Sequence, residues 1–159
     1  MFNDNLILFI NGYVKNLSIA EDLAADTFAE LIVKRSPYIE KYSFKTWLFR
    51  IARNNAIDYI RKYKRHINIS LSDSDTAEED ALERSIVRSE QQTELRSSLK
   101  KIKKDYSDVL YLIYFEQMSY EEAGLILKKS NKQIKNLVFR AKHALRETMI
   151  KEGFNYEEL

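Results

Sequence analysis

Two capping boxes placed close together constrain the fold of this chain more than any other feature of its sequence. One runs from Ser119 to Glu122 and the other from Ser130 to Gln133. In a capping box the serine caps the first turn of a helix, and the acid or amide three residues later reaches back to the serine amide, so each box marks a helix start. Starts this close leave room for one short helix and a tight turn. The run from 119 to 146 is therefore predicted to be a helix-turn-helix.

The scarcity of helix breakers extends the helical prediction to the whole chain. Its 159 residues include three glycines and one proline, and no run alternates apolar with polar residues long enough to predict a sheet. Ser36-Pro37 breaks the first long helical run, and a third capping box is predicted from Ser18 to Glu21. We expect an all-α protein with two small helical domains joined by a flexible acidic linker, the C-terminal one a helix-turn-helix.

Composition excludes several kinds of site. The chain has no cysteine, which rules out disulfides and thiolate metal sites, and His66 and His143 are too few and too far apart for a usual zinc site. We expect no metal and no cofactor. No apolar run reaches membrane-spanning length, and the apolar N-terminal stretch lacks the cationic region and cleavage site of a signal peptide. It is predicted to be a core helix of a cytoplasmic protein that does not insert into a membrane.

Charge is segregated along the chain. Residues 34–66 carry ten bases and two acids, residues 73–83 carry six acids and no base, and residues 93–151 carry thirteen bases and seven acids. Basic blocks attract phosphates, whereas an acidic block repels them or meets a basic partner. This pattern predicts a domain at 1–66, an acidic linker at 67–92, a second domain at 93–150 and a tail at 151–159.

Periodicity divides the second helix of the C-terminal pair into two faces. At about 100° per residue, one buried stripe is formed by Ile134, Val138, Ala141 and Leu145. The opposite side is polar and cationic but includes Phe139, whose ring suits the apolar thymine methyl of the major groove. Gly124 in the first helix allows the two helices to cross closely. The alternative is an ordinary helical hairpin with a solvated basic face.

This run resembles the last conserved region of sigma factors of the extracytoplasmic-function group. The resemblance rests on Met118-Ser119-Tyr120-Glu121-Glu122-Ala123-Gly124, then Ser130, Ile134-Lys135, and Arg140-Ala141-Lys142 with Leu145. In that family the second helix recognises the upstream (−35) promoter element. The resemblance implies base and phosphate contacts from Lys132, Gln133, Lys135, Asn136, Phe139 and Arg140. The chain departs from the family at Lys128-Lys129, where glycine is frequent, and at Lys103, where proline is frequent.

A second basic-aromatic segment runs from Phe44 to Arg65. Its apolar residues gather on one face and its cations on the other, while Trp47, Asn54 and Asp58 follow a boundary between them. An aromatic ring and an amide beside cations suit a single strand, because phosphates meet the cations and unstacked bases meet the ring and the amide. The alternative is a core helix with a solvated basic side, in which Trp47 belongs to the core.

The segment resembles the family's second conserved region over Ser43-Phe44-Lys45-Thr46-Trp47-Leu48-Phe49-Arg50-Ile51-Ala52-Arg53-Asn54-Asn55-Ala56-Ile57-Asp58-Tyr59-Ile60-Arg61. In the family this region melts the downstream (−10) element, and one base is flipped into a pocket beside the preceding loop, here Glu40 to Ser43. Flipping costs about a few kcal/mol, so pocket contacts must offset it. The resemblance implies strand capture by Tyr42, Trp47, Arg50, Arg53, Asn54 and Arg61, and leaves the selected base open.

Ala20-Glu21-Asp22-Leu23-Ala24-Ala25-Asp26-Thr27-Phe28 resembles the family segment that docks on the clamp of core RNA polymerase. The resemblance implies polymerase contacts from Glu21, Asp22, Asp26 and Phe28. The alternative is an amphipathic core helix with acids near its N-terminus, where the helix dipole favours them, and both descriptions are compatible. Family members usually carry more helix before this segment, so either the first helix is short or the true start lies upstream. In the family the linker threads polymerase channels that hold nucleic acid; a solvated tether is the alternative here.

Three classes of function compete. A sigma factor, which binds core RNA polymerase and promoter DNA and catalyses no reaction itself, gives a role to both motifs and to the linker. A stand-alone helix-turn-helix regulator that binds a symmetric site as a dimer leaves residues 44–65 and the linker without a role. An enzyme is disfavoured because the chain has no phosphate-binding glycine loop, no cysteine nucleophile and no metal-ligand spacing. The resemblance also implies an anti-sigma factor as a partner.

Overall fold

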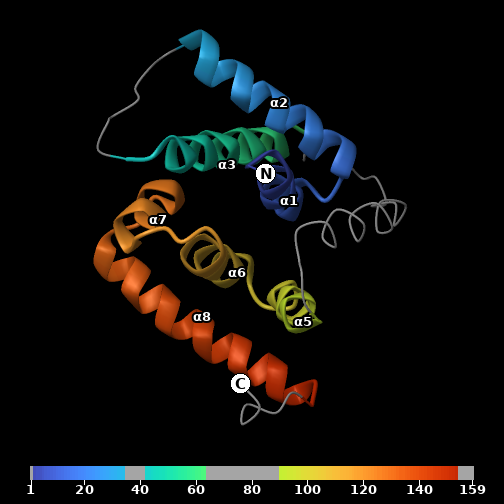
Figure 1. Cartoon of the computed structure of the whole chain (residues 1–159), viewed down its shortest axis with the longest axis vertical. Helices are drawn as coiled ribbons and strands as arrows, with labels where there is room; N and C mark the ends of the chain where they lie inside the picture. The colour runs from blue at the N-terminus through green and yellow to red at the C-terminus, as the bar shows by residue number, and fades with distance from the viewer. Residues whose placement is uncertain (1, 35–41, 64–89, 154–159) are drawn as a thin grey trace. The chain divides into compact units, whose positions relative to one another are not determined.

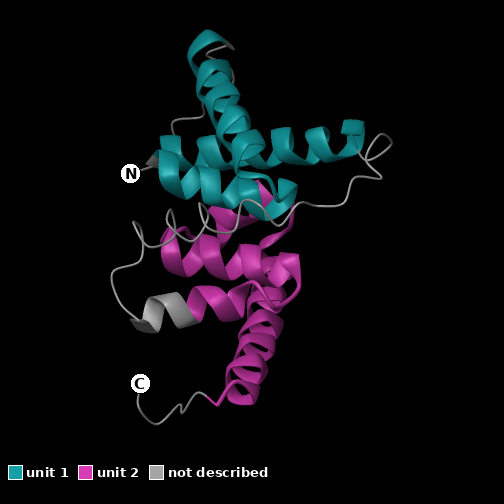
Figure 2. Ribbon diagram, turned by 90° about the vertical axis from the view of Figure 1, so that its right-hand side faces the viewer, with its two compact units in different colours: residues 1–88 teal, residues 89–159 magenta. Residues whose placement is uncertain are grey.

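The protein is built from two compact helical units, residues 1–88 and 89–159 (Figures 1 and 2). The computed structural model describes residues 2–34, 42–63 and 90–153, and these ranges contain helices and short connections but no strand. The all-α, two-domain prediction is confirmed to that extent. The predicted linker falls outside the described residues up to position 89, as do Ser36-Pro37 and Glu40.

The first unit consists of α1 (Phe2–Val14), α2 (Leu17–Lys34) and α3 (Phe44–Tyr63), and each helix contacts the other two. The apolar stretch at the N-terminus is the core helix that the sequence predicts. The ring centroids of Phe9 and Phe49 lie 5.1 Å apart, joining α1 to α3. Asn55 joins α3 to α2, because its side-chain amide donates to Thr27 Oγ1 and to Glu30 Oε2, both at 3.2 Å.

The start of α2 differs from the prediction. Ser18 lies inside the helix and does not cap it; Asn16 is the cap, since its Oδ1 accepts from the backbone amide of Ile19 at 3.1 Å. The reason is the end of α1, where Lys15 has a left-handed backbone with φ 53°. α1 therefore ends at Val14, and α2 begins at Leu17, directly after Asn16.

The second unit consists of α5 (Glu90–Leu99), α6 (Lys104–Leu110), the π-helical turn η2 (Tyr111–Phe115), α7 (Tyr120–Leu127) and α8 (Asn131–Lys151). α8 contacts α5, α6 and α7 along its length (Figure 1). Val109, Leu112, Ile126 and Ile134 are fully buried between these elements. The unit is therefore organised around one face of its last helix.

A polar network fixes the chain between η2 and α7. The Arg96 guanidinium lies 5.6 Å from the Tyr111 ring centroid and 5.1 Å from that of Phe115. The Tyr111 hydroxyl donates to Glu116 Oε1 at 2.7 Å, and burial, followed by the charge of Glu116, raises the pKa of Tyr111. Glu116 thus satisfies a buried hydroxyl at the residue that ends the π turn, just before the helix pair begins.

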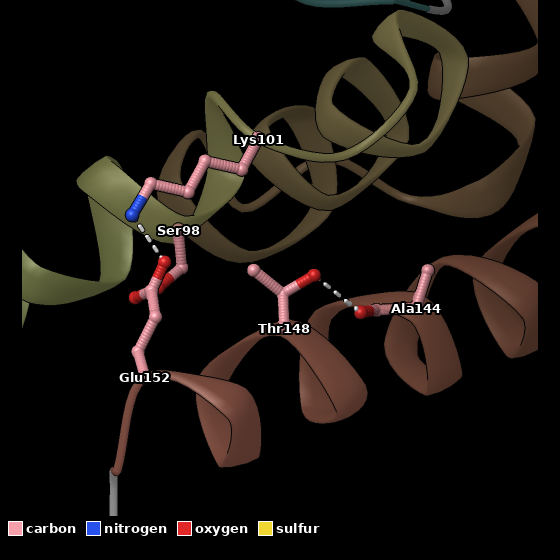
Figure 3. Close-up of polar contacts among 5 residues, drawn as sticks. All are labelled: Ser98, Lys101, Ala144, Thr148 and Glu152. Carbon is pink, nitrogen blue, oxygen red and sulfur yellow. Dashed lines mark hydrogen bonds and ion pairs between the residues drawn. The ribbon is translucent and has the colours of Figure 1, made fainter.

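The far end of α8 is tied to the connection between α5 and α6 (Figure 3). Glu152 accepts a hydrogen bond from Ser98 Oγ at 3.0 Å and pairs with the Lys101 ammonium. The hydrogen bond from Lys101 lowers the pKa of Glu152. Thr148 Oγ1 donates to the Ala144 carbonyl at 3.0 Å one turn earlier. These contacts hold the C-terminal end of α8 against α5 and the turn that follows it.

Candidate nucleic-acid interface

Both capping boxes of the helix pair are formed, as the sequence predicts. Ser119 Oγ accepts from the amide of Glu122 at 3.1 Å, and the Glu122 carboxylate accepts in return from the Ser119 amide at 3.3 Å. Ser130 and Gln133 make the same reciprocal pair at 3.2 and 2.9 Å. These bonds satisfy orphan donors at the start of α7 and of α8.

The turn between the two helices explains why residue 124 is glycine. Lys128 has a left-handed backbone with φ 58° and ψ 49°, and the amide of Lys129 donates to the Gly124 carbonyl at 2.9 Å. A Cβ on Gly124 would lie 2.5 Å from the Lys129 carbonyl oxygen but 3.6 Å from Ile134 Cγ1. Glycine is thus required by the turn backbone more than by the helix crossing that the sequence suggested. Lys128 takes the conformation that glycine would adopt at lower cost.

α8 presents one buried and one exposed face. Ile134, Val138 and Ala141 are buried, and Leu145 is half-buried, which confirms most of the predicted stripe. Phe139 is 76% exposed on the outer side. The six residues predicted to contact the upstream element are all exposed: Lys132, Gln133, Lys135, Asn136, Phe139 and Arg140. The fold therefore leaves this set available to a partner.

A cluster that the sequence reasoning missed flanks this face. Tyr114 of η2 and Tyr120 of α7 are 52% and 39% exposed, and the ammonium of Lys142 on α8 lies 5.2 Å from the Tyr114 ring centroid. A hydrogen bond to Tyr114 raises the pKa of Lys142, and Tyr120 is close enough to raise it further. No spacing rule signals this cluster, because its members come from three elements.

α3 arranges its predicted contact residues less uniformly. Trp47 is 3% exposed and belongs to the core, so the boundary position assigned from periodicity is wrong. Near the start of α3, after the exposed Phe44, the residues Thr46, Trp47, Leu48 and Phe49 are buried in succession. The Arg50 guanidinium lies 4.9 Å from the Trp47 ring centroid. The ring is therefore placed to hold a cation in position.

The remaining residues of the predicted strand-capture set are accessible to different degrees. Tyr42, Arg53 and Asn54 are half-buried, and Arg61 is exposed. Arg53 Nε donates to the Tyr13 hydroxyl of α1 at 3.1 Å. The Asn54 Oδ1 atom is buried without a hydrogen-bond partner among the described residues. Asn5 Oδ1 and Asn11 Oδ1 of α1 share this property among the described residues, and such unsatisfied buried acceptors are uncommon.

The predicted polymerase contacts lie on α2. Glu21, Asp22 and Asp26 are exposed, whereas Phe28 is half-buried. Thr27, the neighbour of Phe28, is fully buried and donates through Oγ1 to the Leu23 carbonyl at 2.7 Å. One side of α2 is thus committed to the core, and three carboxylates remain on its outer surface.

The two units each match a family. Residues 5–66 match the Sigma-70 region 2 model, and residues 92–145 match the model of Sigma-70, region 4. The RNA polymerase sigma factor YlaC of Bacillus subtilis (strain 168) is 30% identical over 86% of this chain and 80% of its own length. This chain belongs to the sigma-70 family.

Further similarities place this sigma factor in the extracytoplasmic-function (ECF) group. The ECF RNA polymerase sigma factor SigM of Bacillus subtilis (strain 168) is 29% identical over 99% of this chain and 95% of its own length. The sigma factor RpoE, solved in complex with the anti-sigma factor NepR from Bartonella quintana, has the same fold. It gives a TM-score of 0.69 at 23% identity over 93% of this chain and 91% of RpoE.

Membership defines the general activity. The protein is a sigma factor that directs transcription initiation, and its two family domains bind core RNA polymerase and promoter DNA. Sigma factors are not enzymes. Within the part of the chain that the structure describes, no helix is long and apolar enough to cross a membrane.

Proposed function

We propose that the two units divide promoter recognition between duplex and single strand. The 93–150 domain recognises the upstream (−35) element as duplex, and the 1–66 domain captures the opened strand of the downstream (−10) element. The observation that carries this proposal is Phe139, which is 76% exposed on a cationic helix face opposite the buried residues Ile134, Val138 and Ala141. Exposing a phenyl ring to water is unfavourable, and an apolar contact in a DNA groove removes that cost.

Upstream recognition is assigned to the outer face of α8. Asn136, Phe139 and Arg140 contact base edges, because an amide, a ring and a guanidinium suit adenine, the thymine methyl and guanine respectively. Lys132, Gln133 and Lys135 hold the helix in register through phosphates and neighbouring base edges. All six side chains are exposed, which this role requires.

Strand capture is assigned to α3 and to Tyr42, the residue before the helix cap Ser43. Asn54 supplies a buried acceptor that has no partner among the described residues, which suits the exocyclic amine of an unpaired base. Arg53 and Arg61 meet phosphates, and Tyr42 lies next to Ser43, whose Oγ accepts from the Thr46 amide at the start of α3. Trp47 contributes indirectly, because its ring holds the Arg50 guanidinium in position.

The proposal includes two protein partners, core RNA polymerase and an anti-sigma factor. The exposed carboxylates of Glu21, Asp22 and Asp26, with Phe28 beside them, form the polymerase-docking face of α2. We also propose that an anti-sigma factor holds the protein inactive. Support comes from the solved complexes of RpoE with NepR and of CnrH with the cytosolic domain of CnrY, both of which share this fold. The protein would act in the cytoplasm, where RNA polymerase meets the chromosome.

Run-off transcription tests the proposal. Core RNA polymerase is given a fragmented genomic library with and without this protein, and the transcript ends are mapped. We expect new discrete transcripts whose templates share an upstream and a downstream element. Absence of stimulation, together with failure to co-purify with core polymerase, contradicts the proposal and favours a stand-alone regulator with a symmetric binding site.

A further inference from the structure

We propose that Lys142 is a phosphate contact at one edge of the upstream promoter duplex and that Tyr114 is the residue that positions it. The inference rests on the proposed role of α8 in duplex recognition. Neither residue belongs to the contact set that the sequence implies. Tyr114 lies outside the helix pair, and Lys142 lies to one side of Phe139 on the exposed face of α8.

The position of Lys142 on α8 is the first argument. It follows Phe139 by three residues, which at about 100° per residue places it about 60° away from Phe139 around the helix axis. Lys135 and Arg146 fall on the same side of Phe139, and all three cations are exposed. A helix in the major groove meets base edges along its centre and the sugar-phosphate backbone at its edges. A row of cations at one edge therefore suits phosphates.

The contact with Tyr114 is the second argument. The Lys142 ammonium lies 5.2 Å from the Tyr114 ring centroid. A free lysine has many rotamers, and ordering them on binding reduces affinity. A side chain that is already held against a ring from another element needs less ordering. Tyr114 is itself 52% exposed, so the pair is accessible to DNA.

The nature of the occupant follows from the chemistry. A lysine ammonium is a compact positive charge with three donors and no planar fork, so it recognises a phosphate without selecting a base. Tyr120, in the first turn of α7, is 39% exposed and raises the pKa of Lys142 slightly. Lys142 thus supplies the charge that a phosphate oxygen requires.

Salt dependence tests Lys142. The full-length protein is assembled with core RNA polymerase, and its affinity for duplex DNA carrying the mapped upstream element is measured from about 50 to 200 mM salt. We expect Lys142→Gln to reduce the slope of log affinity against log salt by about one and to weaken binding roughly three- to tenfold for all sequences alike. An unchanged slope overturns the proposal, as does a loss confined to one base pair.

A second lysine-tyrosine pair in the same unit provides the matched control. The Lys103 ammonium lies 5.7 Å from the Tyr106 ring centroid on α6, outside the helix pair. We expect Lys103→Gln to leave the slope as in the wild type; an equal reduction there shows that the effect is general charge loss and overturns the assignment. All variants change exposed or half-buried side chains, so their melting temperatures should agree within about 2 °C.

Tyr114→Ala tests positioning separately. This variant removes the ring that lies beside the Lys142 ammonium, so we expect the wild-type salt slope with about two- to threefold weaker binding, since the charge still reaches the phosphate. Wild-type affinity in this variant removes the positioning role. If the wild-type holoenzyme shows no preference for the mapped element over scrambled duplex, the proposed function of α8 fails first. If that preference is present and only Lys142→Gln has no effect, this inference alone fails.

Discussion

α3 and α8 are basic helices of nearly equal length that the sequence describes in similar terms, yet the fold treats them differently. α3 has 20 residues and α8 has 21. α8 begins with the exposed residues Asn131, Lys132 and Gln133, whereas α3 has a buried run from Thr46 to Phe49 that follows its first two residues. Phe139 of α8 is 76% exposed, whereas Trp47 and Phe49 of α3 are in the core.

The difference shows where helical periodicity is a reliable guide. A helix packed along one side obeys a two-face pattern, and α8 does so because α5, α6 and α7 contact its inner face. A run of four consecutive buried residues, such as 46–49 of α3, has no exposed face, so periodicity cannot assign its residues. In the proposed function, α8 therefore offers side chains directly to DNA, while residues 46–49 of α3 are committed to packing and DNA contact is left to later residues such as Asn54.

The largest expected effect comes from comparing the alanine substitutions of Trp47 and Phe139. Trp47→Ala removes a buried ring and should lower the free energy of unfolding of the first unit by about 3–5 kcal/mol, because the cavity cannot be filled. Phe139→Ala should change it by less than about 0.5 kcal/mol, since the ring is exposed. Urea denaturation of the full-length protein measures both. Equal losses in the two variants would break the comparison between the helices.

Arg140→Ala tests whether the exposed face of α8 recognises bases. If its guanidinium makes a bidentate contact with guanine, binding to the upstream element should weaken by about 1–3 kcal/mol, and selectivity should relax at one base pair. Filter binding or fluorescence anisotropy with holoenzyme and single-base variants of the element gives both quantities. Unchanged promoter selectivity removes Arg140 from the recognition set.

The neighbouring asparagines of α3 separate packing from function. Asn54→Ala deletes an unsatisfied buried acceptor, so stability should stay within about 1 kcal/mol of wild type while strand opening is impaired and polymerase binding is retained. Asn55→Ala is the matched control, since it breaks two hydrogen bonds to α2 and should cost about 1–2 kcal/mol of stability. Permanganate footprints of the melted bubble report opening. A normal bubble with Asn54→Ala contradicts its role in strand capture.

The smallest effect is expected in the turn that orients α8. Lys128→Gly relieves a left-handed residue and should raise the free energy of unfolding by up to about 1 kcal/mol without changing DNA selectivity. Lys129→Gly, at a neighbouring position without a positive φ, should be neutral or destabilising. Thermal denaturation distinguishes the two. A loss of stability with Lys128→Gly would mean that its side chain contributes more than its backbone strain costs.

Some of this architecture is determined within a few residues of sequence. The starts of α7 and α8 are encoded by Ser119 with Glu122 and by Ser130 with Gln133, because each box closes hydrogen bonds over three residues and needs no distant partner. The buried stripe of α8 follows from spacing for the same reason. The family motifs likewise lie in contiguous segments, so the sequence was sufficient to predict the all-α class and both family regions.

The tertiary structure decided what depends on more than one element. Asn16 caps α2 in place of Ser18 because α1 ends at Val14, and either residue has a side chain suited to capping. Trp47 is buried because residues 46–49 of α3 lie in the core that α3 forms with α1 and α2. Lys142 meets Tyr114 only when η2 packs beside α8. In each case the outcome depends on which surfaces the fold brings together, and a local pattern carries no information about a partner many residues away.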